Sequence, residues 1–368
     1  MTRARSGVQH AVARYSREQV NGESTVLRDL LILVSGLALV LVASNQVLAG
    51  TGSAASALAA IGFAMAGYAP IRLVLHSAEI VRDRRTGRSI DRLFQSAVRI
   101  VEPNLDLPLF IAADIEGCIT PANRGEVDLR RFQRLRGYSE FVKRNPEYPQ
   151  LVIFSGRSQG YVELLAQALG MLNSPLDLPF VIENGSALYL PTSKRTVSLL
   201  TPHQLHTLQQ ARTHVMSSLT ENEFEPKYQM VTVNPKDEHQ TIDELRDAVN
   251  DVLRAAGILD DLVVTSTASA VDVTVRGVDK LSGLQEVLKY YPGDKPHVDL
   301  GRVVAIADHL SDRRIVQNVG SAYCPAESVH PEIRELVVNR FGSDHVINAP
   351  CTDFVSMVIE RECGVRIV

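Results

Sequence analysis

The sequence predicts an α/β protein with a mostly parallel sheet covered by helices on both faces, an inserted α+β cap, and an N-terminal transmembrane helical hairpin. Three observations lead to this prediction. Apolar segments of strand length alternate with helix-like segments after residue 107, which is typical of a parallel sheet. The alternation changes character over residues 191–271, the range expected to form the cap, which we call the lid. Finally, no charged residue occurs between Leu30 and Ile71.

The composition describes a folded protein with two unlike parts. The 368 residues are 45% hydrophobic and 22% charged, which is enough for two or more domains with a sizeable core. Residues 1–100 contain 12 arginines against six acidic residues, whereas the remainder contains 26 lysines and arginines against 36 acidic residues. A basic front and an acidic body indicate a membrane-proximal segment joined to a soluble domain, and no nucleic-acid partner is expected. The four cysteines show neither CxxC pairing nor zinc-site spacing, which favours unpaired thiols.

The uncharged stretch has the pattern of two membrane-spanning helices joined by a tight turn. Leu30–Ala49 is about as long as a helix that crosses a bilayer, and Ala54–Leu75 follows after a Gly- and Ser-rich turn. Arginines flank the hairpin on both sides, which predicts that both of its ends, and the domain that follows, face the cytoplasm. A hairpin buried in a soluble core is the alternative interpretation. The expected divisions are a cytoplasmic tail (1–28), a transmembrane hairpin (29–75, with residues 30–75 contacting the lipid bilayer) and a linker helix (76–106).

The first strand of the soluble body is the apolar run Leu109–Ala113. It ends at Asp114, and Glu116 and Gly117 follow at once. A strand of this kind delivers a carboxylate to the carboxyl edge of an open α/β sheet, where active sites of such sheets lie. A helix is expected over residues 128–143.

The second and third strands also end in polar residues. Tyr148–Phe154 is followed by Ser155, Gly156 and Arg157 and then by a helix over 159–169, an arrangement that can hold a phosphate. An ordinary helix N-cap is the alternative for these residues. The third strand, residues 179–182, ends in Glu183-Asn184-Gly185, a strong turn signal.

The lid and the return to the core complete the chain. Within the lid we expect helices over 201–219 and 241–256, a strand over 227–233, and a hairpin of 262–266 with 270–275. The core then comprises residues 107–190 and 272–368. Lys280 begins a helix, and the strand Arg302–Ala307 ends at Asp308, with Asp312 four residues later. Carboxylates, a hydroxyl, an amide and an ammonium group are thereby expected at one edge of the sheet.

In order and spacing, these residues resemble the four motifs of the haloacid dehalogenase superfamily, in the subgroup whose cap lies between the second and third motifs. That subgroup includes Cof-like, sucrose-phosphate and phosphoglycolate phosphatases, and the similarity covers roughly residues 107–368. It implies a Rossmann-like core and a phosphoric monoester hydrolase that uses Mg2+. The expected substrate is a small phosphomonoester, either a sugar phosphate or a phosphoglycolate-like molecule.

The resemblance also implies roles for individual residues. Asp114 matches the nucleophile that forms an aspartyl-phosphate, and Glu116 falls where the general acid/base lies. The expected catalytic residues are Asp114, Glu116, Ser155 and Lys280. The expected substrate-binding residues are Ser155, Gly156, Arg157, Asn184 and Lys280. The expected Mg2+ ligands are Asp114, Glu116, Asp308 and Asp312.

The sequence departs from the common family pattern at three single positions and over residues 309–311, where His-Leu-Ser replaces the more usual Gly/Ser-x-Asn. Glu116 stands where most members have aspartate, Cys118 stands for a threonine, and Ala307 stands for a glycine. A catalytically degenerate regulatory or scaffold protein at the membrane is therefore one alternative, and a phosphotransferase using the same aspartyl-phosphate is another. The lid should determine the substrate, but its polar candidates Lys227 and Tyr228 suit solvated surface equally well. The sequence does not indicate an oligomeric state.

Overall fold

The computed structural model describes residues 98–101, 104, 106–122, 126–267, 269–292 and 299–367. The predicted cytoplasmic tail and transmembrane hairpin lie outside these described residues, as does most of the predicted linker helix. The described end of that range is not helical as predicted, because Val98–Ile100 form a strand. Within the described part of the chain, no helix is both long and apolar enough to cross a membrane.

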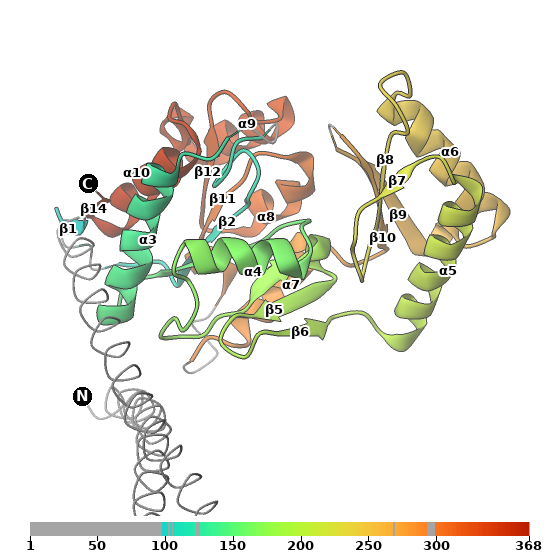
Figure 1. Ribbon diagram of the computed structural model, residues 1–368. Coiled ribbons are helices and arrows are strands. Elements are labelled where there is room, and N and C mark those ends of the chain that lie inside the picture. Colours follow the sequence, from blue (N-terminus) through green and yellow to red (C-terminus); the bar gives the residue numbers. More distant parts are fainter. Residues whose placement is uncertain are drawn as a thin grey trace, which may run out of the picture. The chain divides into compact units, whose positions relative to one another are not determined.

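The core is built on a parallel sheet of five strands (Figure 1). In spatial order the strands are β13 (Val346–Ile347), β12 (Ser321–Pro325), β11 (Val303–Ile306), β2 (Phe110–Ala113) and β3 (Gln150–Ile153). Strand β2 lies between β11 and β3 and is completely buried, and its last residue, Ala113, is paired with Ile306 on one side and Ile153 on the other. Because the three strands end in register, the residues that follow them meet at the same edge of the sheet.

A three-stranded sheet continues from the β3 side. Strand β4 (Phe180–Ile182) is joined to the end of β3 by a parallel bridge between Phe154 and Val181. Strands β5 (Ala187–Leu190) and β6 (Arg195–Ser198) then pair antiparallel. Strand β6 belongs to this core sheet by its pairing, although its residues lie within the range 191–271 that the sequence assigns to the lid.

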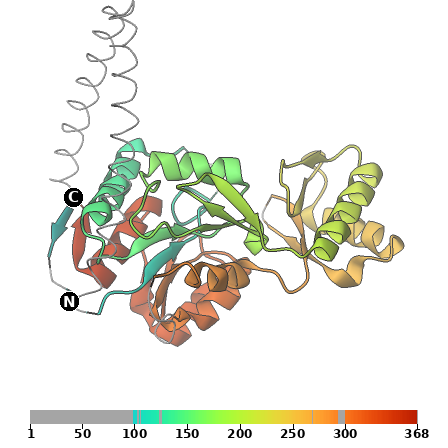
Figure 2. The ribbon, with the colours of Figure 1, turned by 90° about the horizontal axis from the view of Figure 1, so that it is seen from below.

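Helices cover the sheet on both faces, and Figure 2 shows α3 and α4 on the side opposite the orange helices that follow β11. Helix α3 begins at Leu129 because the carboxylate of Asp128 accepts hydrogen bonds from the first free backbone N–H groups. The helices of the core are α3 (Leu129–Arg144), α4 (Gln159–Ala168), α7 (Lys280–Leu288), α8 (Arg313–Asn318), α9 (Pro331–Phe341) and α10 (Cys351–Cys363). Near the chain's C-terminal end, β1 (Val98–Ile100) and β14 (Val365–Ile367) form an antiparallel pair.

The lid is a four-stranded antiparallel sheet with two helices and a hydrophobic core of its own. Its strands, in spatial order, are β7 (Glu223–Phe224), β8 (Val231–Asn234), β10 (Val271–Val275) and β9 (Leu262–Ser266). Strand β10 belongs to the lid by its pairing, although residues 272–275 lie in the range that the sequence assigns to the core. Helices α5 (Pro202–Ser218) and α6 (Ile242–Ala255) both begin with capping boxes, at Thr201 and Thr241. Helix α6 buries Leu245, Val249 and Leu253, which recur every four residues and therefore share one face.

One lid strand starts later than its sequence predicts. A strand is expected over 227–233, but β8 begins at Val231. The guanidinium of Arg212 donates hydrogen bonds to the backbone carbonyls of Lys227, Tyr228 and Met230, which are therefore not paired with a neighbouring strand by these groups. Residues 227–230 consequently form a loop that α5 holds in place.

Candidate active site

Asp114 lies at the centre of the sheet edge and is held by hydrogen bonds on its backbone and side chain. Its N–H donates to the carbonyl of Ile306 at 3.0 Å, which continues the pairing of β2 with β11. One carboxylate oxygen, Oδ1, accepts the N–H of Ile115 at 2.8 Å. The side chain is buried, so its orientation is set by these contacts rather than by solvent.

Lys280 brings a cation to the second oxygen of Asp114. Its Nζ lies 2.6 Å from Asp114 Oδ2 and 2.8 Å from Asp312 Oδ1, and the whole side chain is buried. Lys280 is the first residue of α7, whose start is fixed by a capping box between Asp279 and Ser282. The sequence prediction that this lysine joins the strand-end carboxylates agrees with these distances.

A glycine permits the close approach of α7 to the core. Gly185 has φ +90°, and a Cβ placed there would lie 1.9 Å from the backbone oxygen of Asp279. Only glycine can therefore occupy this position without moving the start of α7. The turn Glu183-Asn184-Gly185 thus positions Lys280 as well as reversing the chain.

Three carboxylates, from Asp114, Asp308 and Asp312, gather around this lysine. One oxygen from each lies within 4.8 Å of the others, and all three residues are buried. Gly117 makes room for them: it has φ +73°, and a Cβ there would lie 2.1 Å from Asp308 Oδ2. The backbone at Gly117 therefore lies so close to the Asp308 carboxylate that any residue with a Cβ would collide with it.

Burial and mutual repulsion change the proton affinity of this cluster. Burial, opposed by Lys280 and reinforced by Asp312, raises the pKa of Asp114 to about 7. Burial and the charges of Asp114 and Asp312 raise the pKa of Asp308 to about 9. Although burial opposes it, the two neighbouring carboxylates raise the pKa of Lys280 above its usual value. One ammonium group does not balance three buried carboxylates, so the cluster favours a further cation.

The residues of the cluster fit a divalent metal ion with a preference for oxygen ligands. Mg2+ is commonly held by a few carboxylates, with water and phosphate completing its coordination. Asp114, Asp308 and Asp312 offer such a donor set, whereas no nitrogen or sulfur ligand belongs to it. The predicted ligands Asp114, Asp308 and Asp312 are thus brought together.

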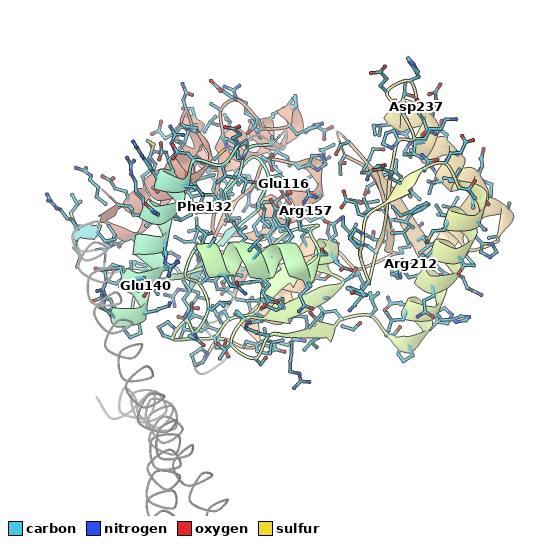
Figure 3. All side chains as sticks on the ribbon, viewed as in Figure 1. Glu116, Phe132, Glu140, Arg157, Arg212 and Asp237 are labelled. Atoms are coloured by element: carbon cyan, nitrogen blue, oxygen red, sulfur yellow. The ribbon has the colours of Figure 1, made fainter. Side chains whose placement is uncertain are left out.

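Glu116, the fourth predicted ligand, departs from the prediction. It does not belong to the carboxylate cluster, because its Oε1 accepts a hydrogen bond from Nε of Arg157. The glutamate arm is one methylene longer than the aspartate common in the family, and it ends at this guanidinium. Glu116 and Arg157 lie next to each other on the core (Figure 3). The structure therefore places Glu116 beside the site but outside the metal-binding set.

The second strand end supplies the hydroxyl group and the backbone amides. Ser155 is completely buried, and its Oγ accepts the N–H of Arg157 at 3.2 Å. Gly156 faces Asn184, whose Oδ1 would lie 2.9 Å from any Cβ at that position. The N–H of Asn184 donates to the carbonyl of Ser155 at 3.1 Å, and the N–H of Glu183 donates to that of Arg157 at the same distance. The predicted substrate-binding residues of the second and third strands are therefore neighbours.

Cys118 and Ala307, the two other departures from the family pattern, are both buried. The Sγ of Cys118 lies 3.9 Å from Asp308 Oδ1. Burial, together with the charges of Asp308 and Asp114, raises the pKa of this thiol well above its usual value. The protonated thiol is thus a weak donor to Asp308, which is the kind of contact that a hydroxyl group at this position would also make.

Two charged lid residues near the site, Glu225 and Asp272, are not among the residues that the sequence singles out, and the side chain of the lid candidate Lys227 is almost completely buried. Glu225 and Lys227 belong to the loop before β8, and Asp272 belongs to β10. Nη1 of Arg157 lies 3.7 Å from Glu225 Oε2, and Nδ2 of Asn184 donates to Asp272 Oδ2 at 3.4 Å. No motif marks Glu225 or Asp272 as a site residue in the sequence, because their position relative to the core depends on how the lid folds. Arg276 donates to the carbonyls of Asp260 and Leu262 within the lid.

No protein-family model matches the sequence, and no curated protein matches it. Solved structures do match. A crystal structure of a Thermoplasma acidophilum protein has 16% identity, a TM-score of 0.51, and covers 70% of this chain and 98% of its own. A HAD/Cof-like hydrolase from Plasmodium vivax has 12% identity, a TM-score of 0.50, and covers 70% and 96%. The sucrose-phosphatase from Synechocystis has 16% identity, a TM-score of 0.47, and covers 70% and 98%.

At these identities the comparisons concern the fold. The first two structures match this chain over 70% of its length. The chain therefore shares its fold with these two structures, and its own parallel sheet agrees with the α/β architecture that its sequence predicts.

Proposed function

We propose that this protein is a Mg2+-dependent phosphatase that hydrolyses a small phosphomonoester through an aspartyl-phosphate on Asp114. The observation that carries the proposal is the contact of Lys280 Nζ with both Asp114 and Asp312 at a shared strand edge, 2.6 and 2.8 Å away. The ammonium group of Lys280 thus orients the buried carboxylate of Asp114. The buried Ser155 lies at the same edge, where three carboxylates outnumber the one ammonium group. Phosphoryl transfer requires this kind of positioned charge.

In the first step, a carboxylate oxygen of Asp114 attacks the phosphorus atom of the substrate. The bond from phosphorus to the ester oxygen breaks, and that oxygen leaves with the electron pair. Lys280 and the hydroxyl of Ser155 stabilise the negative charge on the transferring group, because both are fixed before the reaction. Glu116 in its protonated form gives its proton to the departing alkoxide. Asp114, Asp308 and Asp312 would hold a Mg2+ ion, which when bound would neutralise further negative charge on the phosphoryl group.

In the second step, a water molecule attacks the phosphorus of the aspartyl-phosphate. Glu116, now a carboxylate, takes a proton from this water, so the residue returns to its starting state. The bond from phosphorus to Asp114 breaks, which releases inorganic phosphate and restores the carboxylate. Two easier steps thereby replace one difficult displacement by water.

The substrate and the location of the enzyme are part of the same proposal. The lid closes one side of the strand edge with polar residues, which suits a small sugar phosphate or a phosphoglycolate-like molecule. The uncharged stretch Leu30–Ile71 and its arginine flanks support attachment to the lipid bilayer through residues 30–75, with the catalytic domain in the cytoplasm.

Substitution of the nucleophile tests the proposal. The full-length protein should hydrolyse p-nitrophenyl phosphate when Mg2+ is added and lose this activity when Mg2+ is chelated. Asp114→Asn should abolish turnover, because an amide cannot form the acyl-phosphate bond. Asp243→Asn is the matched control: it makes the same change at an exposed lid residue paired with Arg246, and activity should persist.

Two results would contradict the proposal. Turnover that survives Asp114→Asn would show that another group accepts the phosphoryl group. Absence of both turnover and Mg2+ binding in the wild-type protein would instead favour a regulatory or scaffold protein with this fold.

A further inference from the structure

A chain of five side chains with alternating charge connects the core to the lid. It consists of Glu116, Arg157, Glu225, Lys227 and Asp272, and we call it the charge chain. After the Glu116–Arg157 pair, the successive contacts are 3.7 Å from Arg157 to Glu225, 3.2 Å from Glu225 to Lys227, and 3.9 Å from Lys227 to Asp272. The first two residues belong to the core and the last three belong to the lid.

The lid end of the charge chain is rigidly fixed. The side chain of Lys227 is only 6% exposed, and its Nζ donates to Thr232 Oγ1 at 2.8 Å. Thr232 in turn donates to Asp272 Oδ1, and both residues are on paired strands, β8 and β10. The position of Glu225 is therefore tied to the lid sheet, because its partner Lys227 is anchored there.

The core end of the charge chain is Glu116, whose orientation depends on Arg157. The guanidinium of Arg157 offers Nε to Glu116 and Nη1 to Glu225, and it lies over the ring of Tyr161 at 5.3 Å. The N–H groups of a guanidinium point in fixed directions relative to one another. A carboxylate that binds on one side, such as that of Glu225, therefore affects how the N–H on the other side points toward Glu116. The same glutamate that carries the proton in the proposed reaction is thus linked to a lid residue through a single arginine.

A second contact joins the same lid loop to the core. The carboxylate of Glu183 accepts the N–H of Tyr228 at 3.1 Å and also accepts the N–H of Gln229. Glu183 precedes Asn184 in the turn that packs against the start of α7. This contact and the pair of Glu225 with Arg157 both join the loop to the core, so a displacement of the lid that breaks the first would also separate Glu225 from Arg157.

We propose that Glu225 is a positioning residue of the lid that orients the Glu116 carboxylate through Arg157. The inference rests on the proposed function, since it assumes that Glu116 acts as the general acid. When the lid lies over the strand edge, Glu225 contacts Arg157, and Arg157 holds the Glu116 carboxyl group in the orientation that proton transfer needs. When the lid is displaced, Glu225 leaves Arg157 and Glu116 loses this orientation. Proton transfer to the leaving group is thereby restricted to the closed site.

Substrates with different leaving groups distinguish this role from a structural one. p-Nitrophenolate departs without needing a proton, whereas the alkoxide of glycerol 2-phosphate needs one. In the full-length protein, Glu225→Gln should lower kcat/KM for glycerol 2-phosphate by about 10- to 100-fold, as expected for a misplaced catalytic group. The value for p-nitrophenyl phosphate should fall much less. Glu221→Gln, the same change at an exposed lid residue paired with Lys236, should leave both values unchanged.

A double variant and a measurement without substrate complete the test. When Glu116→Gln has already removed the acid, adding Glu225→Gln should cause no further loss on glycerol 2-phosphate. Amide hydrogen exchange of the loop at residues 225–229 should become faster in Glu225→Gln and remain unchanged in Glu221→Gln.

Three results would overturn the inference. Equal losses of kcat/KM on both substrates would show that Glu225 does not act through the acid. A full additional loss in the Glu116→Gln background would show the same, and unchanged hydrogen exchange would show that Glu225 does not tether the lid. If the wild-type protein hydrolyses neither substrate, the proposed function itself fails, and this result is separate because it appears before any variant is compared.

Discussion

The strand edge of the core and the facing side of the lid handle buried charge in opposite ways. At the strand edge, Asp114, Asp308 and Asp312 share a single ammonium group, and two of these acids have raised pKa values. In the lid, Lys227 lies between Glu225 and Asp272, and Arg157 of the core faces Glu225. The strand-edge cluster has three acids and one ammonium group and is completed by a bound cation or substrate, whereas every acid of the charge chain already contacts a cation. The strand-edge cluster is therefore suited to catalysis, and the charge chain is suited to holding other residues in position.

Removal of each buried lysine gives the largest effect and tests this comparison directly. Lys280→Met leaves Asp114 and Asp312 without their ammonium partner, which should cost about 3–5 kcal/mol of unfolding free energy in the absence of Mg2+. Activity should fall by at least about 100-fold, as when one preorganised charge-stabilising group is lost. Denaturant titration and steady-state kinetics measure the two quantities.

Lys227→Met is the matched change in the lid, because this lysine is also almost completely buried between carboxylates. It should lower stability while leaving much more of the activity on p-nitrophenyl phosphate than Lys280→Met does. If the two variants lost equal activity, the distinction between a chemical cluster and a positioning cluster would be wrong.

The strand-edge cluster could be predicted from the sequence, whereas the charge chain could not. Asp114, Ser155 and Asp308 each follow a short apolar strand, and parallel strands in register must bring such residues to one edge. Lys280 was predicted from its place at the start of a helix, and the structure confirms that it reaches Asp114. The prediction succeeded because local pattern and sheet geometry determine these positions together.

The contacts of Glu116 and of the lid residues could not be predicted from the sequence. Nothing near Glu116 in the chain indicates that its carboxylate turns toward Arg157, 41 residues away. Glu225 and Lys227 lie in an irregular loop shaped by Arg212, so neither a strand nor a helix period applies to them. Their contacts depend on tertiary packing of the lid, which the pattern of a single segment does not contain.

A further prediction concerns how the stability of the protein depends on pH through the carboxylates of Asp114 and Asp308. Because the pKa values of Asp114 and Asp308 are raised in the folded protein, the folded state holds protons that the unfolded state has released above about pH 4. Their contribution to stability therefore falls as pH rises from about 4 through about 7 for Asp114 and about 9 for Asp308. Mg2+ competes with these protons, so it should stabilise the protein more at high pH.

Thermal unfolding with and without Mg2+ measures this effect. The rise in Tm on adding Mg2+ should be small at about pH 5 and larger near pH 9, where Asp114 is ionised and about half of the Asp308 carboxyl groups have lost their proton. Asp308→Asn should remove most of the difference between the two pH values. An equal rise in Tm at both pH values would mean that Mg2+ does not bind at these carboxylates.

The smallest expected effect comes from a single methyl group placed against the cluster. Gly117→Ala and Gly257→Ala introduce the same side chain at similar left-handed φ angles of +73° and +71°. Each should cost about 1–2 kcal/mol of backbone strain. At Gly117, however, the new Cβ would also lie 2.1 Å from Asp308 Oδ2, whereas at Gly257 no atom lies within 4 Å. Gly117→Ala must therefore displace the Asp308 carboxylate.

This pair separates the geometry of the cluster from the general stability of the fold. Gly117→Ala should weaken Mg2+ binding by about 10- to 100-fold, the usual range when a metal ligand loses its supporting contact. Gly257→Ala, in the lid, should unfold at a lower temperature with its Mg2+ affinity unchanged. Calorimetric titration of Mg2+ into both variants gives the comparison, and equal affinities would show that the position of Asp308 does not control binding of the ion.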